Sequence, residues 1–111
     1  MSRHVGFSLE TSEAGDTLLV RPQGELDLAT TPELERLVLG RLEQGRAVVL
    51  DLRGLEFMDS TGLRTLVSAD QRARDAGRRL AIVRGPEAVD RIFHVTRLDE
   101  RLELVDDPAV A

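Results

Sequence analysis

The residues best placed to do chemistry lie in the stretch LEFMDSTGLRTLV, residues 55–67. An apolar run ends at Asp59, and Ser60, Thr61 and Gly62 follow before a helical pattern begins. A hydroxyl at such a junction can cap the helix, because it accepts a hydrogen bond from a free N–H of the first turn. It can also carry a phosphate, because the free N–H groups and the positive dipole end favour an anion. The junction therefore predicts either a simple cap or a surface that is modified or bound.

Ser60 and Gly62 carry these two interpretations. Ser60 is the expected N-cap, and a phosphate there would add about −1.5 to −2 charges without unfolding the domain. Gly62 falls in the first helical turn, where alanine would be preferred by about 1 kcal/mol if only helix formation mattered. A glycine at this position indicates that another group approaches the backbone closely.

The composition excludes several kinds of site. The 111 residues carry a formal charge of −5, which argues against nucleic-acid binding through bulk charge. All 15 basic residues are arginines, so mechanisms that need a lysine, such as a P-loop or a Schiff base, are excluded. Cysteine is absent, which excludes disulfides, thiol nucleophiles and thiolate metal sites. We find no signal peptide and no apolar segment of about 20 residues, so we expect no membrane span and a cytoplasmic location.

The remaining titratable residues fit structural roles. His4 and His94 have no second metal-ligand type at a recognisable spacing, so neither predicts a metal or catalytic site. Asp51 and Asp59 could pair as carboxylates, but Asp51 falls near a strand end and is expected to stabilise a loop or face solvent. A cluster of arginines is expected to be a solvated helix end, namely Arg72, Arg74, Arg78 and Arg79. We expect no cofactor and no metal.

Hydrophobic periodicity predicts one domain over residues 1–111, with residues 1–3 and 107–111 frayed. The predicted strands are residues 5–10, 17–22, 47–52, 80–83 and 102–105, and the strand at 47–52 is expected to be covered on both faces. The first predicted helix begins at Thr30, the second covers residues 61–76, and the third begins at Gly85-Pro86. Thr30 with Glu33 fits a capping box, and Pro32 fits the first turn. Short helices between buried strands imply parallel pairing with right-handed crossovers beside the N-terminal antiparallel hairpin. The expected fold is an α/β sandwich with a mixed, mostly parallel sheet, in the order ββαβαβα plus a short last strand.

Two strings in the sequence resemble one known family. DSTGLRTLV after an apolar strand, together with GELDLATTPEL at residues 24–34, is similar to the STAS domain of bacterial anti-sigma factor antagonists. The resemblance covers nearly the whole chain, from the first hairpin through the third helix. It implies a STAS-like fold and a regulatory binding protein that is modified but is not itself an enzyme.

The resemblance also implies how such a protein is switched. Antagonists of this family bind a cytoplasmic anti-sigma factor that is also an ATP-dependent serine kinase, and the binding frees a sigma factor. The nucleotide is held by the partner. The kinase phosphorylates the antagonist on the serine that follows the aspartate, the modified form releases its partner, and a serine phosphatase resets it.

Carried onto this chain, the resemblance makes Ser60 the phosphoacceptor. Asp59 flanks it, and Asp27, from Gly-Glu-Leu-Asp, lies near it and helps the loop to engage the kinase. The docking face is implied to include Thr61, Gly62, Leu63 and Arg64. Arg64 stands where some members have glycine, which leaves the choice of partner open. Thr61 is a second hydroxyl that could be modified instead, but Ser60 is favoured because the family's acceptor directly follows the aspartate.

Two alternatives remain open at this point. The chain could be a non-switching scaffold or accessory STAS protein of a stress-signalling assembly or a lipid-transport complex, with Ser60 acting only as a cap. It could also be a small hydrolase or nucleotide-binding enzyme that uses Asp27, Asp59 and Ser60. Against the enzyme stand the missing histidine, lysine and metal-ligand sets around those residues.

Overall fold

The hydrophobic alternation near the N-terminus folds into an antiparallel hairpin, as the sequence predicts. The computed structural model describes residues 6–110, so the predicted roles of His4 and Val5 lie outside the described residues. β1, Ser8–Ala14, pairs with β2, Thr17–Leu26, across a tight turn in which Gly15 has a φ of +61°. Both strands extend further toward the C-terminus than predicted, because each finds a ladder partner there: residues 11–14 of β1 pair with residues 17–20 of β2, and residues 24–26 of β2 pair with residues 55–58.

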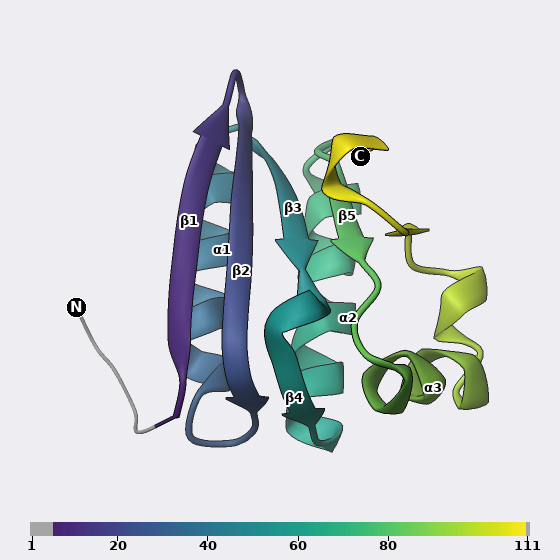
Figure 1. Cartoon of the computed structure of the whole chain (residues 1–111). Coiled ribbons are helices and arrows are strands. Elements are labelled where there is room, and N and C mark those ends of the chain that lie inside the picture. Colours follow the sequence, from purple (N-terminus) through teal and green to yellow (C-terminus); the bar gives the residue numbers. More distant parts are fainter. Residues whose placement is uncertain (1–5, 111) are drawn as a thin grey trace.

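The other strands pair in parallel, as expected from the helices between them. β3, Ala47–Asp51, pairs with β2, and β5, Leu80–Val83, pairs with β3. The short strand β6, Leu104–Val105, closes the order β1-β2-β3-β5-β6. The predicted α/β class and the mixed, mostly parallel sheet are therefore confirmed (Figure 1).

One strand was not separated from its neighbour in the sequence analysis. A 3-10 turn, Leu52–Gly54, follows β3 and leads into β4, Leu55–Met58. β3 pairs with the first half of β2, from Thr17 to Val20, whereas β4 pairs with the second half, from Gly24 to Leu26. The apolar segment is thus two strands that pair with successive parts of β2, and β4 lies directly before the candidate junction.

Two long helices cover one face of the sheet. α1, Thr31–Glu43, and α2, Ser60–Asp75, lie behind the sheet in Figure 1, and neither covers its front face. α3, Glu87–Val95, begins after Pro86 as predicted and contacts β4. The core between sheet and helices is aliphatic, and its fully buried members include Leu18, Val20, Leu26, Leu34, Leu50, Leu66, Ile82 and Phe93.

The opposite face of the sheet carries a smaller apolar cluster. Val49, Ala81 and Val83 are buried there, and Leu19 and Val105 pack against them in part. β3 and β5 are therefore buried on both faces, as the continuous run at 47–52 predicts. The remaining short elements are 3-10 turns at Leu98–Glu100 and Pro108–Val110.

The predicted capping box at the start of α1 is not formed. Thr30 is the N-cap residue, but its side chain makes no cap hydrogen bond. Its hydroxyl instead donates to the carbonyl of Glu25 at 2.8 Å. Glu33 Oε2 is buried with no hydrogen-bond partner among the described residues. A tertiary contact with the end of β2 has replaced the local one, whereas Pro32 does lie in the first turn as predicted.

Within residues 6–110, none of the helices combines the length and the apolar character that a bilayer crossing requires. The same residues hold no group of three or more histidine or acidic side chains that is arranged to hold a metal ion.

Candidate functional site

The register of two parallel strands brings the two predicted acids to one edge of the sheet. Leu26, the last residue of β2, is paired with Met58, the last residue of β4. Asp27 and Asp59 are the next residues of each strand, and the backbone N–H of Asp59 donates to the carbonyl of Leu26 at 3.1 Å. Figure 1 shows the arrowheads of β2 and β4 at the same end of the molecule, where α2 begins. The two predicted segments are therefore adjacent in the fold.

The Asp27 side chain shapes the loop that leads into α1. Its Oδ1 accepts hydrogen bonds from the backbone N–H groups of Ala29, at 3.0 Å, and Thr30, at 3.2 Å. Such a turn, closed by an aspartate, fixes the loop without help from a regular element. A consequence is that Leu28 points outward with 74% of its surface exposed.

Asp59, and not Ser60, caps α2. Asp59 has extended backbone angles, and its Oδ1 accepts a hydrogen bond from the N–H of Gly62 at 3.0 Å. The prediction that Ser60 is the N-cap is wrong, because aspartate caps as well as serine and Asp59 is the residue that leaves β4 in extended form. Ser60 is the first residue of α2 and is exposed. Its hydroxyl is therefore not needed to cap the helix.

Gly62 is required by the chain's own packing. It is buried, and a Cβ built on it would lie 2.9 Å from the carbonyl oxygen of Leu26 and 2.8 Å from Cγ of Met58. The close approach that the sequence indicates is thus made by the ends of β2 and β4 and not by an outside group. Gly62 lets the start of α2 lie against the strand pair, and because it is buried it offers little surface to a partner.

The other residues of the predicted docking face differ in exposure. Thr61 and Leu63 are partly buried, and Leu63 packs against the main core. Arg64 is exposed, as is Ser60 one turn before it. The outward face of the first two turns of α2 is therefore formed mainly by Ser60 and Arg64.

Two exposed apolar side chains near the junction were missed by the sequence analysis. Leu28 follows Asp27 directly, and Phe57 lies two residues before Asp59 with 50% of its surface exposed. The available signal was that each lies within two residues of an acid that follows a strand, because an apolar run by itself is typical of a buried strand. Large exposed apolar residues beside a candidate site are typical of a surface that contacts another protein.

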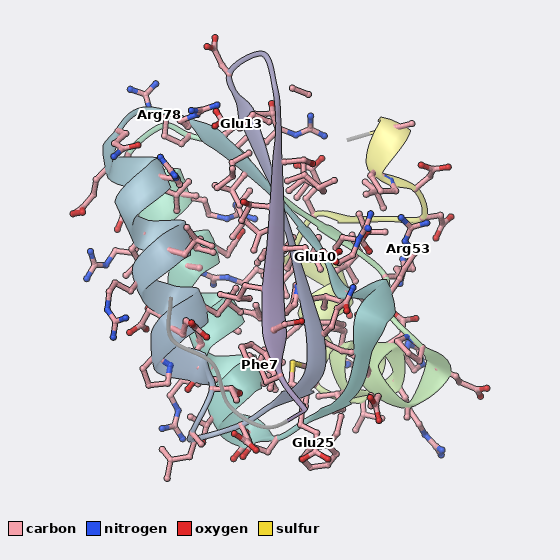
Figure 2. All side chains as sticks on the ribbon, turned by 60° about the vertical axis from the view of Figure 1, so that its left-hand side comes forward. Phe7, Glu10, Glu13, Glu25, Arg53 and Arg78 are labelled. Carbon is pink, nitrogen blue, oxygen red and sulfur yellow. The ribbon has the colours of Figure 1, made fainter. Side chains whose placement is uncertain are left out.

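An acidic groove lies on the same end of the molecule. It has a volume of about 520 Å³, and Glu25, Asp27 and Glu56 contribute carboxylates to its lining together with Phe7. Figure 2 shows Phe7 and Glu25 at this end, far from Glu13 and Arg78 at the hairpin end. The surface around the junction thus combines carboxylates with the exposed side chains of Leu28 and Phe57.

Asp51 stabilises the turn that leads to the site and does not pair with Asp59. It is fully buried, and it accepts hydrogen bonds from Arg21 Nε at 3.0 Å and from Arg53 Nε and Nη2 at 3.0 and 2.9 Å. The backbone N–H of Arg53 donates to it as well, at 3.1 Å. Burial alone would raise the pKa of Asp51, but the hydrogen bonds from Arg53 and Arg21 outweigh it and hold that pKa below its ordinary value. The predicted loop-stabilising role is confirmed, and the predicted solvent exposure is not.

The predicted arginine cluster lies at the other end of α2, and two of its four members form ion pairs. Arg74 pairs with Asp70 at 2.9 Å, and Arg79 pairs with Glu103. His94 is largely exposed, and its Nδ1 lies 3.3 Å from Asp99. These contacts support the structural roles that the sequence predicts for them.

Comparison with known proteins identifies what the chain resembles. The model of the STAS domain family matches residues 8–111. The anti-sigma-B factor antagonist of Staphylococcus epidermidis is 30% identical over 101 residues, which cover 90% of this chain and 94% of that protein. The crystal structure of an anti-sigma factor antagonist from Mycobacterium paratuberculosis superposes with a TM-score of 0.84 at 24% identity, covering 98% of this chain and 93% of that one. The Bacillus cell fate determinant SpoIIAA in its phosphorylated form superposes with a TM-score of 0.72 at 19% identity, covering 94% and 95%.

Replacing Gly62 by alanine tests the packing at the start of α2. Helix propensity alone would favour alanine by about 1 kcal/mol, but overpacking against a backbone carbonyl costs about 1–3 kcal/mol. We expect Gly62→Ala to lower the free energy of unfolding measured by urea denaturation. Gly40→Ala in α1 is the control, because no atom lies within 4 Å of its Cβ position, and we expect it to raise stability. A stabilising Gly62→Ala would contradict the assigned contact.

Replacing Asp51 by asparagine tests the buried carboxylate. The folded pKa of Asp51 is lowered, so its contribution to stability is present above the ordinary value of 3.8 and is lost as pH falls through the folded value. We expect Asp51→Asn to cost about 1.5–3 kcal/mol at pH 7, the range for hydrogen bonds to charged groups. The difference from the unmodified protein should shrink below about pH 4 in urea denaturation at several pH values. Glu56→Gln, at an exposed acid of β4, should show no such difference at pH 7, and a constant gap for Asp51→Asn would refute the assignment.

Proposed function

Since the chain belongs to the STAS domain family, we propose that it is an anti-sigma factor antagonist. In this proposal it acts in the cytoplasm and binds an anti-sigma factor that is also a serine kinase, so that a sigma factor is released. The kinase, which holds the ATP, phosphorylates Ser60, and the modified antagonist lets go. A serine phosphatase restores the binding form. The chain itself binds and is modified, and it catalyses no reaction.

The observation that carries this proposal is the position of Ser60. It is exposed at the first residue of α2, and Asp59 makes the capping hydrogen bond in its place. A phosphate at such a position meets a favourable dipole and needs no change of fold. The names of the curated relatives and the existence of a phosphorylated form of SpoIIAA support the same function.

The proposed docking surface surrounds Ser60 on three segments. The loop after β2 contributes Asp27 and Leu28, β4 contributes Phe57, and the outward face of α2 contributes Arg64. Thr61 and Leu63 contribute their partly exposed atoms, and Gly62 contributes only the close fit of α2 against the strands. Burial of the apolar side chains supplies affinity, and the charged groups select the partner.

The size of the switch is within reach of one phosphate. A hundredfold loss of affinity corresponds to about 2.8 kcal/mol. A dianion buried against a partner without a cation to meet it can supply this through desolvation and repulsion. Asp27 and Asp59 already make the surroundings negative, so the phosphate adds to an existing charge of the same sign. No refolding of the domain is required.

Replacing Ser60 by alanine tests the modification site. Because Asp59 is the cap, the free energy of unfolding of the variant should lie within about 0.5 kcal/mol of that of the unsubstituted protein, as expected for a surface substitution. After incubation with the cognate anti-sigma factor kinase and ATP, phosphopeptide mass spectrometry should find a phosphate on Ser60 in the unsubstituted protein and none in Ser60→Ala. Thr61→Ala is the control and should still be labelled. Label that persists in Ser60→Ala but disappears in Thr61→Ala would reassign the acceptor. If Ser60→Asp binds the partner as tightly as the unmodified protein, the chain is a non-switching scaffold.

Replacing Leu28 or Phe57 by alanine tests the docking surface. Both side chains are largely outside the core, with 74% and 50% of their surface exposed, so neither change should affect folding. Each truncation should weaken binding of the anti-sigma factor about tenfold, measured by calorimetry, because truncating a residue at the centre of an interface costs more than about 1 kcal/mol. Val95→Ala is the control, since Val95 is 71% exposed but lies on α3. Equal affinities for all three variants would place the interface elsewhere.

A further inference from the structure

Arg64 lies one helical turn after Ser60 on the exposed side of α2. Both side chains are exposed, as is Ser68 a further turn along, whereas Thr65 and Leu66 are buried. Side chains four residues apart in a helix are neighbours on its surface. A group attached to Ser60 therefore lies within reach of the Arg64 guanidinium.

The same helix already contains one pair of this geometry. Asp70 and Arg74 are also four residues apart in α2, and Asp70 Oδ2 lies 2.9 Å from Arg74 Nε. A phosphoserine side chain is longer than an aspartate side chain, so an anion at Ser60 can span the same interval to Arg64. The order is also the favourable one, with the anion nearer the N-terminus of the helix and the cation nearer the C-terminus.

Arg64 has no carboxylate to neutralise it before modification. Among residues 6–110 no acidic side chain lies within 4.0 Å of it, whereas Arg21, Arg53, Arg74, Arg79 and Arg84 all have such partners. The first turn of α2 contains no acidic residue. The carboxylate of Asp59 is directed at the N–H of Gly62. Within α2 no acidic residue lies three or four positions from Arg64, so a phosphate on Ser60 would be its one anionic neighbour on that helix.

We propose that Arg64 is the internal receptor for the phosphate on Ser60, and that this capture is part of the switch. The inference rests on the proposed function, in which Ser60 is the modified residue. In the unmodified protein the Arg64 side chain is exposed on the docking surface, and in the complex it pairs with an acidic group of the anti-sigma factor. In the modified protein the phosphate binds Arg64 through charge-assisted hydrogen bonds and withdraws it from the partner. Phosphorylation thus adds an anion and removes a cation at the same place.

The pairing can be tested without any kinase. Phosphoserine is incorporated at position 60 during translation, and the second pKa of the phosphate is measured by phosphorus NMR titration. A neighbouring cation favours the dianion, so Arg64→Gln should raise this pKa by about 0.3 pH units or more, while Arg64→Lys should raise it by less. Arg72→Gln is the control, because Arg72 is exposed on the same helix but lies about 18 Å from Ser60 along the helix axis, at 1.5 Å per residue. Equal pKa values for the phosphate in the unsubstituted, Arg64→Gln and Arg72→Gln proteins would overturn the inference.

The effect on the partner is tested with the same variants and the cognate anti-sigma factor. Arg64→Gln should weaken binding of the anti-sigma factor to the unphosphorylated form at least threefold. It should also reduce the ratio of the affinity of the unphosphorylated form to that of the phosphoserine form. Arg72→Gln should change neither. An unchanged ratio in Arg64→Gln would overturn the role of Arg64 in the switch. The proposed function fails separately, if the kinase does not label Ser60 while the phosphate pKa still responds to Arg64.

Discussion

The register between β2 and β4 is the constraint on which the candidate site depends. With Leu26 opposite Met58, the next residue of each strand is an aspartate, and the hydrogen bond from Asp59 N–H to the Leu26 carbonyl fixes their separation. The oxygen of the same carbonyl lies 2.9 Å from the position that a Cβ of Gly62 would take, so the close start of α2 at this point depends on residue 62 having no side chain. A shift by one residue would move Asp59 away from Asp27 and reverse which side chains of β4 are buried. One pairing therefore sets both acids, the helix start and the direction of Ser60.

The fold class and the two segments of the site were predictable, because they depend on periodicity and on short strings. The apolar runs and the glycines after α1 and α2 indicate the helices and the strands in order, except that β4 was not separated from β3. What the sequence could not give was the division of labour within the string Asp-Ser-Thr-Gly. Both Asp59 and Ser60 are good caps, and the choice between them depends on which residue leaves β4 in extended form. Gly62 was correctly predicted to be a point of close approach. Which group approaches it depends on how β2 and β4 pack against α2, and local sequence does not show this.

The other differences between the predictions and the structure also concern contacts or exposure that appear only in the folded chain. Thr30 looks like one half of a capping box, yet its hydroxyl is taken by the carbonyl of Glu25 at the end of β2. Asp51 looks like a residue at a strand end, yet Arg21 on the neighbouring strand and Arg53 in the following turn make full burial of its carboxylate tolerable. Leu28 and Phe57 look like core residues because composition does not distinguish a buried apolar residue from one at an interface. For Asp51 a contact with Arg21, 30 residues away in the sequence, decides the outcome, and for Thr30 it is a contact with Glu25, five residues before it.

The two ends of α2 differ in a way that fits the proposed switch. Near its C-terminal end Asp70 is almost fully buried, and its carboxylate pairs with Arg74 at 2.9 Å. Near its N-terminal end the equivalent spacing joins Ser60 to Arg64, and here the position of the anion is occupied by a hydroxyl. Because Asp59 has taken over the capping, that hydroxyl is free to gain and lose charge at little cost to the fold. The Asp70–Arg74 pair ties the C-terminal half of the helix to the domain, whereas in the proposed switch a phosphate on Ser60 and its pairing with Arg64 would change only the outward surface.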